Sequence, residues 1–476
     1  MERVLSVYQM QQADKFTIEK LGIGEDELVK RAGEAVADVI KKYYFGGRVL
    51  VCVGKGNNGK DGLVVAEILS KTHGFSVSVF NTETSLYKVF EKEYDIVIDC
   101  LFGTGLNRQV EEKYAQIINK INSLKAVKIA CDIPSGINGD TGEIMGVAVK
   151  ADMTIAIQEY KLGHFLGDGI DYCGQLVCKD IGISVWEYNV VKRVGKKEVK
   201  NLFKPRKRNV NKGTFGKTSI VGGSQDFSGS VVLSTNAVSA LKSGVGYTYL
   251  VVPKTLYIAY VGKIPECILI ALDTDCEDVD ISSLNKVINC NSIAVGMGMT
   301  ASESTYKVIE YLLKNYTGTL IIDADGLNVL SKYGKECLKH KKCNVVLTPH
   351  LGEFARLVGK ERKEINKNIV NISMQFAKEY NVVLAVKSAV SLITDGKETF
   401  INTSGCSGMA KAGSGDALSG LLAGVLAQND ACVENVASVL YLFGKAGELA
   451  QKKGSEYTIT ATDIIEQFAN VIKSLS

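Results

Sequence analysis

The chain has 476 residues, a length that two or three domains would fill. Hydrophobic residues make up 46% and charged residues 23%, which is the mixture of a folded globular protein and excludes a disordered or fibrous chain. The formal net charge of +4 is small for this length and gives no reason to expect nucleic acid as a partner.

The cysteines and the apolar runs bear on the cellular compartment. The 12 Cys residues are scattered singly, without a Cys-x-x-Cys pair or zinc-site spacing, so we expect reduced thiols and no zinc. The first residues contain no apolar signal segment, and no apolar run reaches the roughly 18 residues of a membrane helix. We therefore expect a cytoplasmic protein with no membrane partner.

The first part of the chain alternates helical and strand patterns. Apolar residues at helical spacing predict helices over Val7–Lys20 and Asp26–Lys42. Short β-branched runs then predict parallel strands at Arg48–Val53, Phe75–Phe80, Asp95–Asp99, Val127–Cys131 and Met153–Ile157. Strands of this kind, separated by helices, predict a Rossmann-like doubly wound α/β sheet.

A basic segment separates the two halves of the chain. Residues 191–212 contain ten Lys and Arg and one Glu, which indicates either a solvated linker or a contact with a phosphate-bearing ligand. We place the domain boundary here, with domains over residues 1–200 and 205–476. Later strands are predicted at Lys217–Val221, Tyr247–Val252, Ile268–Leu272, Ile293–Val295, Leu320–Ile322, Val345–Leu347 and Val382–Val386. They again alternate with helices, so the second domain is also α/β.

A glycine-rich loop joins the first strand to the next helix. Gly54–Gly62 has the pattern Gly-x-Gly-x-x-Gly, which lets backbone N–H groups approach a phosphate at a helix N-terminus. No acidic residue stands at the tip of the following strand, Phe80–Asn81, so we do not expect NAD bound as an oxidant. A plain turn and phosphate binding without redox chemistry are the two alternatives.

Two further strand ends carry polar side chains. Asp99 and Thr104 follow one strand, and Asp132 and Ser135 follow the next. An Asp after a strand often only caps a helix, but the carboxyl ends of parallel strands meet at one edge of a sheet, where ligands bind. Several such residues together predict a site in one crevice.

The motifs GKGNNGKDG, DCLFGTGL, DIPSG and YKLGHFLG…DYCGQLVCKDIGI resemble the NAD(P)H-hydrate epimerase domain, over residues 1–185. The resemblance implies epimerisation of NAD(P)H that has added water at nicotinamide C6, with Asp132 as the acid/base residue. It also implies a potassium ion held by Asn58, Asp99 and Ser135. The residues implied to contact the hydrated nucleotide are Asn57, Asn58, Gly59, Lys60, Asp61, Gly103, Thr104, Gly105, Leu106, Asn107, Arg108, Gln109 and Asp132. Lys60 stands where this family usually has Gly, and it either crowds the loop or gives it a cation.

In the second domain, the segment KAGSGDALSG (Lys411–Gly420) opens a predicted helix. Gly413 and Gly415 free backbone N–H groups that can stabilise developing phosphate charge, and Asp416 stands where a base could deprotonate a hydroxyl nucleophile. The alternative is that Asp416 only caps the helix. The arrangement resembles the ribokinase-like fold, whose Gly-x-Gly-Asp motif serves phosphoryl transfer.

Together with NKGTFGK, DADGLN, TPHLGEF and VKSA, this motif resembles the NAD(P)H-hydrate dehydratase, over residues 209–470. The resemblance implies that the C6 hydroxyl attacks a nucleotide phosphoryl group with Asp416 as base, and that magnesium and ADP are used. The implied contacts to the nucleotide are Lys387, Ser388, Ala389, Val390, Ser391 and Gly415, and those to the hydrated cofactor are Ser230, Gly298, His350 and Asp416. The departures from the family pattern are Asn211, the segment Gly296–Met299 and Ser388.

Two residue types in this half have a simpler explanation. A lone histidine such as His350 is more often structural, although its place in TPHLGEF after a strand favours a ligand contact. Asp323 and Asp325 are either site residues or turn and cap residues.

Three functions compete. The first is a bifunctional enzyme that repairs the hydrates of NADH and NADPH (NADHX and NADPHX) with ADP, which we expect to be a homo-oligomer. The second is a vitamin-precursor or sugar kinase, which would leave a stable phosphorylated product. The third makes the first domain a non-catalytic module. The sequence alone decides neither ADP against ATP nor NADHX against NADPHX.

Overall fold

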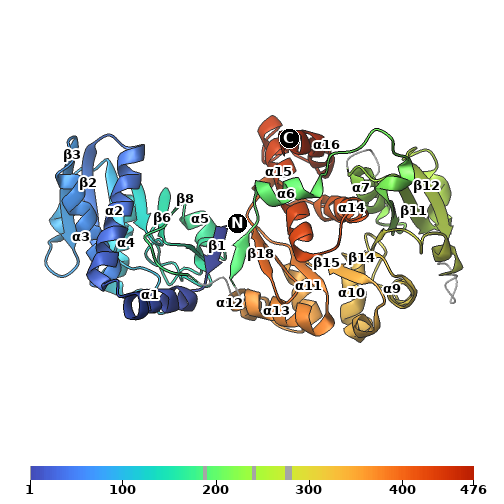
Figure 1. The fold of residues 1–476 in the computed structure, drawn as a ribbon, viewed down its shortest axis with the longest axis horizontal. Coiled ribbons are helices and arrows are strands. Elements are labelled where there is room, and N and C mark those ends of the chain that lie inside the picture. The colour runs from blue at the N-terminus through green and yellow to red at the C-terminus, as the bar shows by residue number, and fades with distance from the viewer. Residues whose placement is uncertain (1, 186–189, 239–242, 274–280, 476) are drawn as a thin grey trace. The chain divides into compact units, whose positions relative to one another are not determined.

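The computed structural model describes residues 2–185, 190–238, 243–273 and 281–475 (Figure 1). The chain divides into two compact units, an N-terminal one that ends at Val190 and a C-terminal one that begins at Val191. Both are α/β, as the sequence predicts, and each is described by itself.

The N-terminal unit is built on a six-stranded parallel sheet in the order β3-β2-β4-β5-β6-β8. The strands are β2 (Gly47–Val53), β3 (Phe75–Asn81), β4 (Ile96–Cys100), β5 (Val127–Cys131), β6 (Met153–Ile157) and β8 (Gln175–Lys179). The helices are α1 (Val7–Leu21), α2 (Glu25–Tyr43), α3 (Asn57–Ser70), α4 (Glu112–Ser123) and α5 (Gly169–Tyr172). The five strands and two helices expected here are confirmed.

Successive residues of β2 point to opposite faces of this sheet, and both faces are covered by helices. Val49, Val51 and Val53 belong to one buried cluster with side chains of α2 and α3. Leu50 and Cys52 belong to a second cluster with the isoleucines of α4. A short parallel pair in the same unit, β1 (Glu2–Leu5) with β7 (Tyr160–Lys161), aligns Leu5 with Lys161.

The C-terminal unit contains strands in the order β12-β11-β10-β13-β14-β15-β16-β17-β18-β9. They are parallel except that β17 runs antiparallel to both neighbours. The strands are β9 (Val191–Arg193), β10 (Lys217–Val221), β11 (Tyr247–Pro253), β12 (Cys267–Leu272), β13 (Ser292–Val295), β14 (Thr319–Ile322), β15 (Asn344–Leu347), β16 (Val383–Val386), β17 (Ser391–Thr394) and β18 (Thr399–Asn402). All seven strands expected for this half are present.

The helices of this unit are α6 (Lys196–Leu202), α7 (Ser228–Val238), α8 (Tyr257–Tyr260), α9 (Glu303–Asn315), α10 (Asp325–Tyr333), α11 (Leu351–Val358), α12 (Arg362–Lys367), α13 (Ile369–Tyr380), α14 (Ser414–Leu426), α15 (Val433–Lys453) and α16 (Ala461–Leu475). Helix α14 lies among α7, α15 and α16 (Figure 1). It is buried along nearly its whole length, and its side chains share one core cluster with those of the other three helices. The first residues of α14 are therefore held rigidly at the sheet, where the Gly-Ser-Gly-Asp motif lies.

The expected boundary lies too late in the chain. Residues 191–200 were assigned to the first domain, but β9 pairs with β18, and Val199 of α6 is packed in the core of the C-terminal unit. The partner of Lys192 is Phe400, so a pairing across about two hundred residues decides where these residues belong. Part of the basic segment is packed in the same way, because the Arg206 guanidinium lies 3.8 Å from the ring centre of Phe215.

Within residues 2–185, 190–238, 243–273 and 281–475, no helix has the length and apolar character needed to cross a membrane.

Candidate active sites

The loops after β2, β4 and β5 line a cavity of about 1100 Å³ at the carboxyl edge of the N-terminal sheet. The cavity takes in most residues that the sequence assigned to a hydrated nucleotide. The lining members are Asn57, Asn58, Asp61, Gly103, Thr104, Gly105, Leu106, Asn107, Arg108, Gln109 and Asp132. Gly59, Lys60, Asp99 and Ser135 lie outside this lining.

The glycine pattern of this loop has a packing cause. A Cβ on Gly54 would lie 2.0 Å from the carbonyl oxygen of Leu101, and a Cβ on Gly59 would lie 2.0 Å from the carbonyl oxygen of Gly54. Both positions are therefore closed to any side chain. The glycines allow close approach of backbone to backbone at the start of α3, whose first two residues, Asn57 and Asn58, line the cavity.

Lys60 points toward α2. Its Nζ lies 3.2 Å from Glu25 Oε1, and both side chains are half exposed. The hydrogen bond from Lys60 lowers the pKa of Glu25, which itself lines the cavity. Of the two alternatives for Lys60, the structure does not support crowding of the loop, because the side chain is turned outward to an acidic partner.

Asn58 and Ser135 both contact the backbone of Phe102, and Ser135 contacts Asp99. Ser135 Oγ donates to Asp99 Oδ1 at 2.6 Å, and Ser135 N donates to Asp99 Oδ2 at 2.7 Å. Asn58 Nδ2 donates to the carbonyl oxygen of Phe102 at 2.8 Å, whereas the buried Asn58 Oδ1 has no hydrogen-bond partner. An unsatisfied buried oxygen is costly, and an amide oxygen beside a carboxylate and a hydroxyl is a donor set that suits a hard cation.

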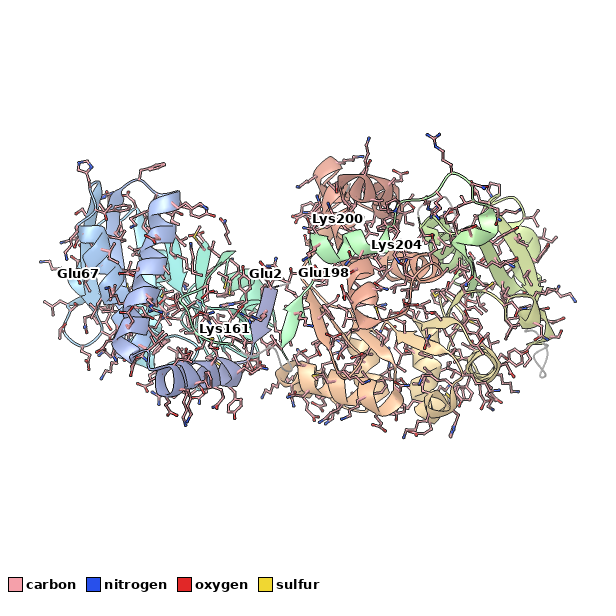
Figure 2. All side chains as sticks on the ribbon, in the orientation of Figure 1. Glu2, Glu67, Lys161, Glu198, Lys200 and Lys204 are labelled. Carbon is pink, nitrogen blue, oxygen red and sulfur yellow. The ribbon has the colours of Figure 1, made fainter. Side chains whose placement is uncertain are left out.

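Asp132 follows β5 in a strained conformation. Its φ of 66° is in the left-handed region, which a residue other than glycine rarely adopts. Asp132 Oδ1 accepts hydrogen bonds from Ile157 N at 3.1 Å and from Lys161 Nζ. Lys161, labelled in Figure 2, is only 1% exposed, so the ion pair is largely shielded from water and fixes the carboxylate at the cavity wall.

His164 supports Asp132 from the side away from the cavity. Its Nδ1 accepts from Lys161 N at 3.0 Å, so the proton is on Nε2, which donates to the carbonyl oxygen of Asp132 at 2.7 Å. Burial and the Lys161 charge lower the pKa of His164 to about 4. The imidazole is therefore neutral near pH 7 and acts here as a hydrogen-bonding support.

Two further carboxyl groups of the cavity bind protons unusually strongly. Burial and the Asp132 charge raise the pKa of Asp61 to about 8. Burial raises the pKa of Asp14, on α1, to about 6. Asp61 is thus protonated near pH 7 and can donate a proton into the cavity.

Three residues of this site were missed by the sequence analysis as individual residues. Lys161 and His164 are part of the motif YKLGHFLG, but a lysine beside an apolar strand gives no sign that it is buried. Asp14 lies on the first helix, and only the folded chain brings it to the cavity.

In the C-terminal unit, α14 begins at the Gly-Ser-Gly-Asp motif. Gly413 precedes the helix with a φ of 89°, a conformation that favours glycine. A Cβ on Gly415 would lie 3.4 Å from Lys387 Nζ and 3.8 Å from Asp323 Oδ2. The motif therefore lies against the ends of β14 and β16, as a site at the carboxyl edge requires.

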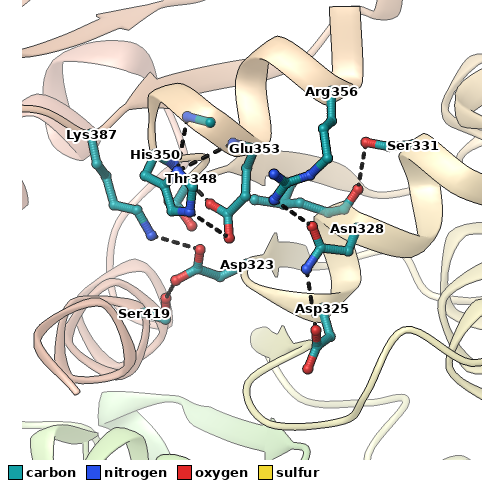
Figure 3. Close-up of polar contacts among 12 residues, drawn as sticks. Asp323, Asp325, Asn328, Ser331, Thr348, His350, Glu353, Arg356, Lys387 and Ser419 are labelled. Atoms are coloured by element: carbon teal, nitrogen blue, oxygen red, sulfur yellow. Dashed lines mark hydrogen bonds and ion pairs between the residues drawn. The ribbon is translucent and has the colours of Figure 1, made fainter. Parts of the chain in front are cut away.

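Lys387, Asp323 and Ser419 form a polar group under this helix (Figure 3). Lys387 Nζ donates to Asp323 Oδ1 at 2.7 Å, and Ser419 Oγ donates to Asp323 Oδ2 at 2.6 Å. Asp323 is 2% exposed, so both its oxygens are committed to these partners. Asp325 accepts from Thr300 N at 2.9 Å and from Asn328 at 3.2 Å. It therefore holds a neighbouring turn, as one alternative expected, but it does not cap α10.

Burial and the Asp323 charge raise the pKa of Asp416 to about 6, while the Ser230 hydroxyl and Lys387 act in the opposite direction. Ser230 also lies beside Gly298, because a Cβ on Gly298 would be 3.1 Å from Ser230 Cβ. The structure thus brings together Asp416, Ser230 and Gly298, three of the four residues assigned to the hydrated cofactor.

His350, the fourth, is a helix cap. Its Nδ1 accepts from Gly352 N at 2.9 Å and from Glu353 N at 3.2 Å, at the start of α11 (Figure 3). The structural alternative for His350 is therefore present. A ligand contact is compatible with this cap, because the capping bonds use only Nδ1 and the ring is half exposed, with its Nε2 3.5 Å from Glu353 Oε1.

The loop assigned to the nucleotide joins β16 to β17. Ser388 and Ala389 are exposed, Val390 is buried, and Ser388 Oγ donates to the carbonyl oxygen of Val390 at 2.6 Å. The loop is anchored by Lys387 N, which donates to the carbonyl oxygen of Pro349 at 2.7 Å. This backbone contact joins the loop to the TPHLGEF segment. Asn211, by contrast, is an exposed residue at the start of a short helical turn.

A doubly wound sheet followed by a unit with Gly-Ser-Gly-Asp at a buried helix defines a two-domain nucleotide-handling α/β protein. The family model described as NAD(P)H-hydrate dehydratase matches residues 218–470, and the one described as YjeF-related protein N-terminus matches residues 25–91 and 81–163. The chain is 31% identical to a bifunctional NAD(P)H-hydrate repair enzyme of Thermofilum pendens, over 99% of this chain and 97% of that protein. It is 30% identical to one of Moorella thermoacetica, with the same coverage.

The chain belongs to this family of bifunctional NAD(P)H-hydrate repair enzymes. The C-terminal fold agrees with this, since the ADP/ATP-dependent NAD(P)H-hydrate dehydratase of Bacillus subtilis, co-crystallised with ATP and Mg²⁺, superposes with a TM-score of 0.52 at 24% identity. That comparison covers 60% of this chain and 99% of the other and supports a ribokinase-like fold.

Proposed function

We propose that the N-terminal unit interconverts the R and S epimers of NADHX and NADPHX, and that the C-terminal unit uses a nucleotide to dehydrate the S epimer. The observation that carries the proposal is that each unit has a carboxylate at the carboxyl edge of its sheet, Asp132 in one and Asp416 in the other, within a chain matched along its length by bifunctional relatives.

For epimerisation, we assign acid/base catalysis to Asp132 and a positioning role to Lys161. Inversion at C6 requires reversible loss of the hydroxyl group or opening of the ring, and both routes need proton transfer to and from oxygen. Lys161 donates to Asp132 Oδ1 and holds this carboxylate at the cavity wall, which suits a base. The protonated Asp61 is placed to donate to the departing hydroxyl, which would otherwise leave as hydroxide.

Potassium fits the oxygen set of Asn58, Asp99 and Ser135, because Asn58 Oδ1 is buried and otherwise unsatisfied. Within the described residues, no group of three or more His, Cys, Asp or Glu side chains is arranged to hold a metal ion. When bound, the ion would supply positive charge beside the cavity and fix the loop after β4.

For dehydration, we assign Asp416 as the base that takes the proton of the C6 hydroxyl as this oxygen attacks the terminal phosphoryl group. The new O–P bond forms while the bond to the nucleotide's leaving oxygen breaks. The ring nitrogen then expels phosphate, and loss of the C5 proton restores the dihydronicotinamide. Phosphate is a good leaving group and hydroxide is a poor one, which explains why a nucleotide is spent.

The backbone amides at Gly415, the ammonium of Lys387 and the loop through Ser391 are assigned to the nucleotide. Ser230, Gly298 and His350 are assigned to the hydrated cofactor. Magnesium would neutralise charge on the nucleotide phosphates, an arrangement that needs few protein ligands. We infer ADP as the donor, and ATP is the alternative, which the same assay tests with each nucleotide in turn.

Product analysis separates this function from that of a small-molecule kinase. The full chain is incubated with the S epimer of NADHX, Mg²⁺ and either ADP or ATP. We expect free phosphate and recovered NADH absorbance in equal amounts. A stable phosphorylated product without NADH absorbance would show a kinase instead.

A further inference from the structure

A second hollow lies in the C-terminal unit, along α11 and the turn that leads to α12. It is a shallow, open hollow of about 690 Å³. Its lining includes Gly352 and Ala355, which are three residues apart on one face of α11, and Gly359, the residue that ends this helix. Their small size leaves the helix backbone open along this face. We call this hollow the α11 groove.

The walls of the α11 groove are basic. They carry Arg356, Lys360, Arg362 and Lys363 against one acidic residue, Glu361. Lys360 is neutralised by an ion pair with Glu364, on α12. The Arg356 guanidinium donates at 2.9 Å to Asn328 Oδ1, a neutral amide. In the part of the chain that the structure describes, neither Arg356 nor Arg362 forms an ion pair with a carboxylate.

The groove adjoins His350. A Cβ on Gly352 would lie 2.5 Å from Arg362 Nη2 and 2.9 Å from His350 Cε1, so the guanidinium and the imidazole both lie against the position where a side chain of residue 352 would begin. The charges of Lys387, Arg356 and Arg362 contribute to lowering the pKa of His350, after burial. Lys387 is paired with Asp323, and the carboxylate nearest the ring is that of Glu353, whose Oε1 lies 3.5 Å from His350 Nε2. Among the described residues, the two arginines stand near this ring without a direct ion pair of their own.

The backbone amides at the start of α11 cannot serve an anion here. They are capped by His350 Nδ1, and Glu353 Oε2 accepts from His350 N at 2.8 Å. An anion in the groove would therefore be held by side chains, and the planar fork of Arg362 matches two oxygens of a phosphate.

We propose that the α11 groove binds a phosphate group of the hydrated dinucleotide, held chiefly by Arg362 with Arg356 beside it. The proposal rests on the assignment of His350 to the hydrated nicotinamide half. In a dinucleotide the diphosphate is separated from the nicotinamide by one ribose, so a molecule that contacts His350 carries its phosphates past the neighbouring cations. The 2′-phosphate of NADPHX has the same chemistry and is the other source of such a group.

The test measures steady-state dehydration by the full chain with NADHX, NADPHX and ADP varied in turn, for wild type and Arg362→Gln. We expect the KM for the hydrate to rise about tenfold, which corresponds to ~1.4 kcal/mol, with kcat and the KM for ADP little changed. Arg362→Lys should restore part of the loss, because it keeps the charge but not the fork. Lys367→Gln is the matched control, since it removes one charge from α12 outside the groove, and it should leave all three constants unchanged.

The two hydrates identify the phosphate. An equal rise for NADHX and NADPHX supports the proposal with the diphosphate as ligand, and a rise for NADPHX alone supports it with the 2′-phosphate. Unchanged KM values for both hydrates, or a rise confined to ADP, would overturn it. If the wild-type chain dehydrates neither hydrate, the proposed function fails independently of the groove. Titration with NADPH then tests the groove alone. About tenfold weaker binding of NADPH to Arg362→Gln than to the wild type supports the proposal, and equal binding rejects it.

Discussion

Lys387 Nζ lies 2.7 Å from Asp323 Oδ1, and this ion pair joins the loop after β16 to the end of β14, directly beneath the start of α14. Its two charges act in opposite directions on Asp416, because Asp323 raises the pKa of that carboxyl and Lys387 lowers it. Burial is the main cause of the raised pKa of Asp416, and the pair adjusts the pH range in which the proposed base can accept a proton.

The first prediction concerns the pH dependence of dehydration. A base must be ionised, so kcat/KM should rise with pH and level off above the Asp416 pKa of about 6. Asp323→Asn should move this acidic limb to lower pH, because it removes a negative charge that disfavours ionisation. Glu466→Gln, which removes an exposed carboxylate from α16, is the control and should leave the limb in place. A limb that moves equally in both variants would show that Asp323 has no specific influence.

The second prediction concerns the stability contributed by the Lys161–Asp132 pair. Asp132→Asn leaves a buried ammonium without a countercharge, and we expect the N-terminal unit to lose about 3–5 kcal/mol of unfolding free energy. The double variant Asp132→Asn/Lys161→Met should recover most of this loss, because no buried charge remains. Hydrogen exchange of peptides from β5 and β6 reports on this unit alone. Equal protection in the wild type and the single variant would contradict the prediction.

A third prediction concerns potassium. If Asn58 Oδ1 is a ligand, exchanging choline chloride for potassium chloride at constant ionic strength should raise the melting temperature of the N-terminal unit. Asn58→Leu should abolish the salt-specific part of this rise, since it keeps the size of the side chain and removes the oxygen. A rise of the same size in Asn58→Leu would place the ion elsewhere.

The fourth prediction concerns the effect of Asp61 on the pH dependence of the stability of the N-terminal unit. Its pKa is raised in the folded chain, so the folded state holds the proton more tightly than the unfolded state, and the resulting stability is lost as pH rises from about 4 through about 8. Asp61→Asn should make the N-terminal unit less sensitive to pH in this range, as followed by hydrogen exchange at several pH values. An unchanged pH dependence would show that Asp61 is ionised throughout.

The sequence predicted the parallel strands well, because buried strands such as Val49–Val53 are continuous apolar runs between helices. It missed β17 and β18, whose antiparallel pairing depends on a turn at Asp395–Glu398, and β9, whose partner lies far along the chain. Local patterns carry no information on such pairings. The expected homo-oligomer and cytoplasmic location stay predictions.

In the candidate sites, too, residues in local motifs could be predicted and residues defined by distant neighbours could not. Motif residues such as Asp132 and Asp416 could be selected because loops at one sheet edge converge. The burial of Lys161 and the capping role of His350 could not, since both depend on neighbours that only the fold supplies. One of the two expectations for His350 was a purely structural role, and its Nδ1 has such a role as the cap of α11.

The most direct test of the account follows an equal mixture of R and S NADHX with ADP and Mg²⁺ until NADH absorbance stops rising. The wild-type chain should consume both epimers, and Asp416→Asn should consume neither while still interconverting them. Asp132→Ala should stop when the S epimer is exhausted and leave the R epimer intact, apart from slow spontaneous interconversion. Rapid consumption of both epimers by Asp132→Ala would contradict the central claim that two carboxylates in two units divide the work.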